Sequence, residues 1–198
     1  MVTTGFSKPY IAKYSSTGTT VTYSEGMKLG RGVELKLDID TADDNNFYAD
    51  NVVAETETSQ FTSGSVTTTI DGLEPAAATL ALGLPETQNV EVGSKQVAFQ
   101  PYGAGMEPSY LGFGCVRRTM MHGKTQYWPF ILPKIRYSLP SEEMATQEDN
   151  IDWQTQELSA TVLRDDTEAQ NWKYLSAAGM DTEAEAEAAV KAFLNITD

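Results

Sequence analysis

The stretch Val33-Glu34-Leu35-Lys36-Leu37-Asp38-Ile39 alternates strictly between apolar and charged side chains. Successive side chains of a β-strand point to opposite faces, so this period of two predicts a strand with one buried and one solvated face. The run Val66-Thr67-Thr68-Thr69-Ile70 repeats the pattern. Both segments indicate a sheet that packs on a core with one side only.

Further strands are predicted on both sides of this pair. Residues 10–14 and 20–23 alternate around a turn at 15–18, which indicates a hairpin. The runs 109–121 and 124–137 flank His122-Gly123 and are typical of a long hairpin, and residues 157–164 predict a last strand.

Two segments predict helices instead. Residues 74–83 have Pro75 in the first turn and Gly83 at the end, which is typical of a short helix. Residues 182–194 begin with Thr182, a good N-cap, and carry an apolar stripe at helical spacing. Strands follow one another without a helix between each pair, so the expected fold is antiparallel β with two peripheral helices.

The composition and the net charge of the chain exclude several classes of protein. The chain has 198 residues, 40% of them apolar, which fits one domain over residues 1–198. Its formal net charge of −14 opposes attraction to phosphate backbones and anionic membranes. No segment is apolar for long enough to span a membrane, and the start does not resemble an export signal. The single cysteine, Cys115, and the single histidine, His122, exclude a disulfide scaffold and an ordinary zinc site.

Charge is distributed in blocks along the chain. Residues 38–91 carry 11 acidic residues and no basic one, whereas residues 92–140 carry 6 basic residues and 1 acidic one. Blocks of this kind suit a chain whose copies pair a basic surface with an acidic surface, because complementary potentials orient association. A solvated acidic monomer is the other interpretation.

The connection between the strands predicted at 33–39 and 66–70 covers residues 40–64, which is long for a compact domain. It is rich in Asp, Asn, Glu, Thr and Ser, yet it also carries five large apolar residues: Phe47, Tyr48, Val52, Val53 and Phe61. A purely solvated loop would not need these side chains. We therefore expect a long loop that folds against something outside its own subunit.

Several blocks occur in an order that resembles a known family. They include Lys8-Pro9-Tyr10-Ile11-Ala12-Lys13-Tyr14, Gly26-Met27-Lys28-Leu29-Gly30-Arg31, Asp43-Asp44-Asn45-Asn46-Phe47-Tyr48-Ala49-Asp50-Asn51 and Ile151-Asp152-Trp153-Gln154-Thr155-Gln156-Glu157-Leu158. Together they resemble the major tail protein family of long-tailed phages and prophages of Gram-positive bacteria, the phi13-type tail tube proteins. The resemblance covers residues 6 to 194 approximately.

The resemblance implies a structural protein that is not an enzyme and has no cofactor. Its fold would be a tail-tube-like β-sandwich or split β-barrel with a short helix and a C-terminal flanking helix. Copies would form rings, usually of six, that stack into a hollow tube for DNA delivery. Its partners would be itself, the tape measure protein, the tail-end and terminator proteins, and passing DNA that is not specifically bound, with no membrane. It would assemble in the host cytoplasm and end in the tail of the virion.

The resemblance also implies roles for particular residues. The long loop would contact the adjacent ring or subunit through Asp43, Asp44, Asn45, Asn46, Phe47, Tyr48, Asp50 and Asn51. Asp152, Trp153 and Gln154 would form a second interface. Asp38, on the solvated face of its strand, is a candidate for a lumen-facing acid that repels DNA.

Three alternatives remain open. A β-sandwich carbohydrate-binding or adhesin module predicts a tryptophan-lined groove in a stable monomer. A minor tail protein would form a single ring that does not stack. An acidic glycosidase would need two carboxylates facing each other, as with Glu142 and Glu143 or Asp165 and Asp166.

Overall fold

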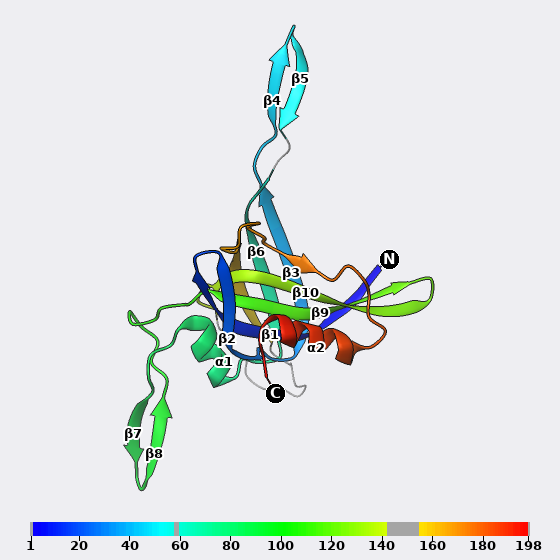
Figure 1. Cartoon of the computed structure of the whole chain (residues 1–198). Coiled ribbons are helices and arrows are strands. Elements are labelled where there is room, and N and C mark those ends of the chain that lie inside the picture. The colour runs from blue at the N-terminus through cyan, green and yellow to red at the C-terminus, as the bar shows by residue number, and fades with distance from the viewer. Residues whose placement is uncertain (1, 58–59, 142–154, 198) are drawn as a thin grey trace, which may run out of the picture.

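The computed structural model describes residues 2–57, 60–141 and 155–197. As the strand patterns predict, the protein is mainly β with antiparallel strand pairing (Figure 1). The main sheet has the order β2-β1-β9-β10-β11-β6-β3, and β12 pairs with β10. Its strands are β1 (Val2–Thr17), β2 (Thr20–Lys28), β3 (Gly32–Thr41), β6 (Phe61–Ile70), β9 (Leu111–Met121), β10 (Lys124–Tyr137), β11 (Gln156–Leu163) and β12 (Tyr174–Leu175).

The sheet is strongly curved, and over the described residues it does not close into a barrel. β10 pairs with β9 from Lys124 to Ile135, with a register shift between Leu132 and Ile135, and it pairs with β11 over Lys134–Tyr137. Such irregularities bend a strand, and here the bend turns β11, β6 and β3 over the first four strands. Phe6 of β1 consequently lies against Gly32 of β3. The arrangement is consistent with the expected β-sandwich with short helices.

The main core lies inside this curved sheet. It is built from fully buried side chains of several strands: Ile11, Val66, Ile70, Leu111, Phe113, Leu132, Ile135 and Leu158. Leu35, Leu37 and Ile39 of β3 pack against it and are half-buried, as their alternation predicts. The same alternation predicts that Val33 faces the core, and this is wrong. Its side chain is 57% exposed, because β3 begins there beside a register shift.

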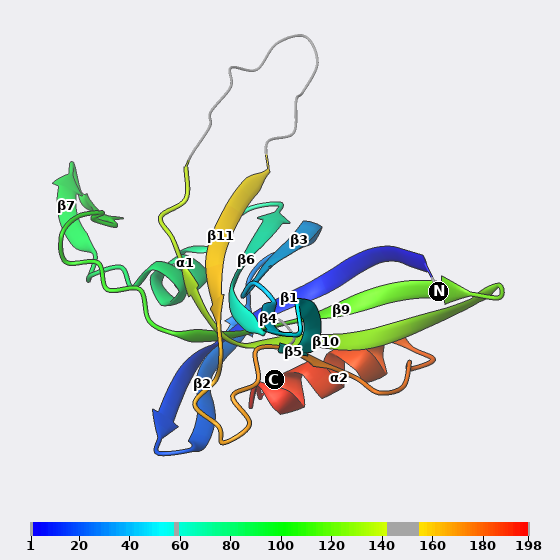
Figure 2. The ribbon, with the colours of Figure 1, turned by 90° about the horizontal axis from the view of Figure 1, so that it is seen from above.

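The helices cover two parts of the sheet (Figure 2). Helix α1 (Pro75–Leu82) buries Ala77, Ala81 and Leu82 in the main core. Helix α2 (Glu183–Phe193) covers the opposite face of β1, β9 and β10, where Val190 and Leu194 form a second core with Val116.

Local sequence explains how α2 starts and docks. Thr182 caps it, since its hydroxyl accepts a hydrogen bond from the backbone N–H of Glu185 and the Glu185 carboxylate accepts one from the N–H of Thr182. The sheet beneath the helix is thinned at Gly114, where an added Cβ would come within 2.6 Å of Val190. A glycine at this point lets the helix approach the strands closely.

Three hairpins extend beyond the body in different directions (Figures 1 and 2). Two of them form separate two-stranded sheets: β4 (Asn45–Ala49) with β5 (Val52–Glu57), and β7 (Gln88–Val92) with β8 (Lys95–Phe99). The third is the distal part of the β9–β10 hairpin, with the N-terminal part of β1 beside it. We call the first two the β4–β5 arm and the β7–β8 arm.

The prediction of a long loop over residues 40–64 is therefore wrong. β3 continues to Thr41, β6 already begins at Phe61, and the β4–β5 arm lies between them. The arm turns at Asp50 and Asn51, which have φ of 51° and 63°. Two consecutive residues at positive φ make the tight hairpin turn that Asp and Asn tolerate best, and this turn folds the connection into strands.

Candidate functional site: hairpin arms and surface clefts

The β4–β5 arm exposes large apolar side chains on both of its faces. Phe47 and Tyr48 are 64% and 62% exposed, and Val52 and Val53 are 62% and 49% exposed. A two-stranded hairpin alone in water is marginally stable and normally gains stability by packing its side chains. The arm therefore has the properties of a segment that packs against another surface.

The structure brings the predicted contact residues together in this arm. Asn46, Phe47 and Tyr48 lie on β4, Asp50 and Asn51 form the turn, and Asp43 and Asp44 precede β4. The backbone of Asn45 belongs to β4. Asp43, Asp44, Asn46, Phe47, Tyr48, Asp50 and Asn51 are all exposed. The arm is acidic, because it contains Asp43, Asp44, Asp50 and Glu55 and residues 38–91 contain no lysine or arginine.

The strand patterns of the sequence analysis do not predict the β7–β8 arm. Its register places Val90 opposite Val97, Gln88 opposite Phe99 and Val92 opposite Lys95 on one face. This face is largely apolar, yet Val92 and Phe99 are 59% and 55% exposed. The alternation of valines around Gly93 is the signal that would have predicted this hairpin.

Asp38 lies where its strand pattern predicts. It is on the solvated face of β3, which is an end strand of the main sheet. Its carboxylate lies 2.8 Å from the ammonium of Lys36, and both side chains are more than half exposed. The hydrogen bond to Asp38 raises the pKa of Lys36. Whether this face meets a lumen stays a prediction.

The second predicted interface, Asp152, Trp153 and Gln154, lies outside the described residues, as do Glu142 and Glu143. The two described tryptophans have different partners. Trp128 donates a hydrogen bond from Nε1 to the hydroxyl of Thr119, whereas Trp172 stacks on Phe61 with 4.8 Å between ring centroids.

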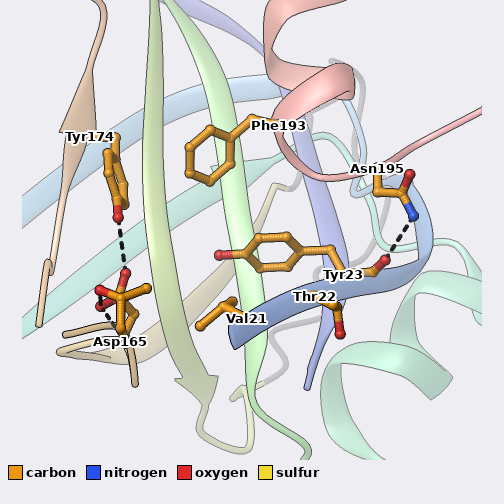
Figure 3. Close-up of a pocket in the computed structure, with 8 residues that line it drawn as sticks. Val21, Thr22, Tyr23, Asp165, Tyr174, Phe193 and Asn195 are labelled. Carbon is orange, nitrogen blue, oxygen red and sulfur yellow. Dashed lines mark hydrogen bonds between the residues drawn. The ribbon is translucent and has the colours of Figure 1, made fainter. Parts of the chain in front are cut away.

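A cleft of about 410 Å³ lies between the β1–β2 hairpin and α2 (Figure 3). Three aromatic rings line it, and Phe193 lies between the other two, with ring centroids 6.0 Å from Tyr23 and 5.0 Å from Tyr174. Its polar lining residues are Thr22, Asp165, Thr167 and Asn195. We call it the aromatic cleft.

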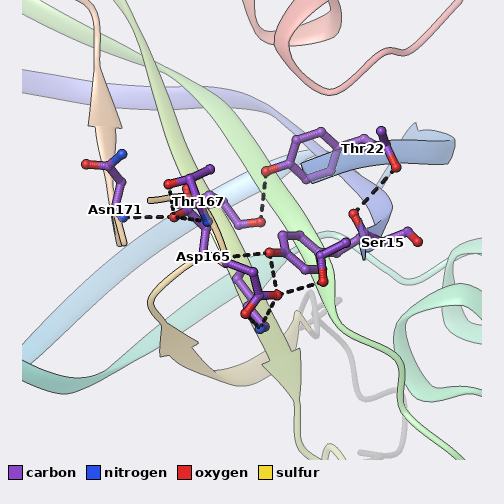
Figure 4. A network of polar contacts seen from close by, with 11 residues as sticks. Ser15, Thr22, Asp165, Thr167 and Asn171 are labelled. Carbon is purple, nitrogen blue, oxygen red and sulfur yellow. Dashed lines mark hydrogen bonds and ion pairs between the residues drawn. The ribbon is translucent and has the colours of Figure 1, made fainter. Parts of the chain in front are cut away.

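The carboxylate of Asp165 organises the segment beside this cleft (Figure 4). Its side chain is buried and accepts hydrogen bonds from the backbone N–H and hydroxyl of Thr167, the N–H of Asn171 and the hydroxyl of Tyr174. These bonds close a turn in the chain after β11. Asp165 therefore has a structural role in this cleft.

Asp166 ties the same segment to the main sheet. It accepts hydrogen bonds from the hydroxyls of Tyr14 and Ser16, and both of its oxygens lie within 2.9 Å of the ammonium of Lys134. These donors, the hydrogen bond from Lys134 first, lower the pKa of Asp166 to about 2. A general acid of a glycosidase needs a raised pKa, which is the opposite shift.

We expect Asp166→Asn to lower stability modestly at neutral pH. Because the Asp166 side chain is 39% exposed, solvent screens the contact and the loss should not exceed about 1 kcal/mol. The folded pKa is lowered, so the stabilisation is complete above the ordinary carboxyl pKa and disappears as pH falls from about 4 through about 2. Melting curves of both proteins at pH 7, 4 and 2.5 test this, and a gap that widens towards low pH would contradict it.

A second cleft, of about 530 Å³, lies at the end of β3 and β6 that is opposite to the β4–β5 arm. It is lined by Lys28, Gly30, Arg31, Asp71, Gly72, Leu73, Glu74 and Pro75. Arg31 and Asp71 join its walls, with 2.5 Å between Nε and Oδ2. We call it the basal cleft.

The described residues contain no group of three or more His, Cys, Asp or Glu side chains placed to hold a metal ion. In the same part of the chain, neither helix has the length and apolar character needed to cross a bilayer. The Cys115 thiol is buried, and this burial raises its pKa.

Comparison of the chain with protein-family profiles and with curated protein sequences finds no match.

Proposed function

We propose that this protein is a structural subunit that assembles with copies of itself into the tube of a phage tail. The observation that carries the proposal is the pair of arms, which hold their large apolar residues out into solvent. Four such residues lie on the β4–β5 arm and four on the β7–β8 arm: Phe47, Tyr48, Val52 and Val53, and Val90, Val92, Val97 and Phe99. Exposed apolar surface gathered on projecting elements is typical of protein interfaces.

The positions of the two arms favour an assembly of many copies over a closed dimer. In Figure 1 the two arms project from opposite sides of the body. Contacts made through different surfaces of each copy are heterologous, and they generate rings or open filaments. Among the described residues, β2 and β3 are the end strands of the main sheet, and their outer edges offer further backbone groups for pairing between copies.

The charge supports a conduit that does not bind DNA. With a net charge of −14, the surface as a whole repels phosphate. Asp38 on the exposed face of β3 is our candidate for a lumen-facing acid, and partners of the tube would include the tape measure and terminator proteins. The resulting particle would be a virion tail assembled in the host cytoplasm.

Sedimentation velocity over a concentration series tests self-association directly. We expect large species to grow at the expense of the monomer as concentration rises, and to be suppressed by Phe47→Ser with Tyr48→Ser, which removes apolar surface from one arm. A wild-type sedimentation coefficient that stays at the monomer value at every concentration would contradict the proposal.

The aromatic cleft supports one alternative, a carbohydrate-binding module. Its volume lies within the range of small-ligand sites, and aromatic faces beside Asp, Asn and Thr are the groups that bind sugar rings. Binding of the protein to a glycan array, measured over a range of protein concentrations, separates the two functions. Only a carbohydrate-binding module predicts saturable binding by a monomeric protein, and Phe193→Ala should remove that binding.

A further inference from the structure

The aromatic cleft combines ring faces with negative charge. Three rings from three different elements line it: Tyr23 of β2, Tyr174 of β12 and Phe193 of α2. In Figure 3 these rings lie around a common space, with Asp165 at its edge. Among the described residues that line the cleft, Asp165 is the one charged side chain. The face of an aromatic ring carries negative partial charge, so the whole lining favours a cation.

The charge of Asp165 has no counter-ion among the described residues. Its carboxylate is buried and accepts hydrogen bonds only from neutral groups. The adjacent carboxylate, Asp166, is instead paired with Lys134, and none of the ion pairs formed by described residues includes Asp165. Buried charges in proteins are normally paired with an opposite charge. The structure thus leaves a buried negative charge beside an open cleft.

The field of this carboxylate reaches the rings of the cleft. Burial raises the pKa of Tyr23 and of Tyr174, and the negative charge of Asp165 is a further cause of the rise at both hydroxyls. Both side chains are therefore neutral at pH 7. A cation held against these rings is attracted by the ring faces and by the carboxylate together.

The polar groups of the lining already have hydrogen-bond partners within the chain. The Tyr23 hydroxyl donates to the carbonyl of Pro133, and the Tyr174 hydroxyl donates to Asp165. The side-chain amide of Asn195 donates to the backbone carbonyl of Tyr23. A ligand with many hydroxyl or N–H groups would compete with these bonds. A quaternary ammonium group has no hydrogen-bond donor to satisfy, so it suits this lining better.

We propose that the aromatic cleft binds a small organic cation with a quaternary ammonium group, of about the size of choline. The ring faces of Tyr23, Tyr174 and Phe193 make the contact, and Asp165 supplies the compensating charge. A cleft of about 410 Å³ has room for such a group. The ligand is a cation without a neighbouring anion, because Asp165 would repel an attached phosphate. This binding site goes beyond the tube function and does not depend on it.

Calorimetric titration of the full chain with choline tests the proposal. We expect saturable binding, and the neutral tert-butyl analogue, in which carbon replaces the charged nitrogen, should bind about 10-fold more weakly. Phosphocholine should also bind more weakly than choline. No binding of choline at millimolar concentrations, or equal affinity for choline and either of the other two compounds, would overturn the inference. Saturable binding of glucose in place of choline would also overturn it, in favour of the carbohydrate-binding alternative.

Phe193→Leu tests whether the rings of this cleft make the contact. Leucine keeps an apolar side chain but removes the ring face, so the affinity for choline should fall about 10-fold while that for the neutral analogue changes little. Phe193 is 39% exposed, so the variant should keep its fold, which its melting temperature checks. The comparison of choline with its neutral analogue needs no variant and remains decisive if this one does not fold.

Tyr102→Leu is the control for this substitution. It removes a ring that is 56% exposed and lies outside the lining of the cleft, so choline binding should stay unchanged. Equal losses of affinity in the two variants, or no loss in a folded Phe193→Leu variant, would overturn the inference.

Discussion

Replacing residues 43–57 with a Gly-Ser-Gly linker should abolish tubes while the subunit still folds. The arm forms its own two-stranded sheet outside the main one, and its apolar side chains are exposed in the single copy. Its removal therefore costs the body little stability but removes the element that we expect to join successive subunits. We expect no assemblies longer than a single ring in electron micrographs.

The fold of this deletion variant needs a separate measurement. Its melting temperature should stay within a few degrees of the wild-type value, since β3 and β6 remain paired through Asp40 and Ser63. Normal tubes from a well-folded deletion variant would remove the β4–β5 arm from the account. An unfolded variant would show instead that the arm stabilises the body, even though its apolar side chains are exposed.

Phe113→Ala should destabilise the subunit strongly. Phe113 lies near the start of β9, its side chain is fully buried in the main core, and truncation leaves a cavity there. Losses of about 3–5 kcal/mol are typical for phenylalanine truncations in cores. Urea unfolding of the two proteins measures the difference.

Phe99→Ala is the matched control for this substitution. Phe99 is 55% exposed on the β7–β8 arm, so the same chemical change should alter the free energy of unfolding by no more than about 0.5 kcal/mol. A small effect at Phe113 would show that the described core is wrong. A large effect at Phe99 would show that the β7–β8 arm packs on its own subunit.

The periodic parts of the fold could be predicted from the sequence. The alternation of Val66 to Ile70, the His122-Gly123 turn and the Thr182 cap depend on residues close together in the chain, and the structure contains the strand, hairpin and helix they predict. Exposed strands are harder to recognise. The sequence of the β4–β5 arm is polar enough to be taken for a loop. The tight turn at Asp50-Asn51 is what makes it a hairpin.

The candidate clefts could not be predicted, because they combine residues far apart in the sequence. The aromatic cleft brings Tyr23 beside Phe193, and the basal cleft brings Arg31 beside Asp71. The first contact depends on where α2 packs on the sheet, and the second depends on the pairing of β3 with β6. The apolar residues of the arm, by contrast, predict an external contact from the sequence alone, and this contact stays a prediction.

Negative-stain electron microscopy of the purified protein over a concentration series, with a crowding agent in half of the samples, tests the central claim most directly. We predict hollow tubes of stacked rings that lengthen as concentration rises. Particles that remain single subunits under all of these conditions would contradict the claim that this protein builds a tube.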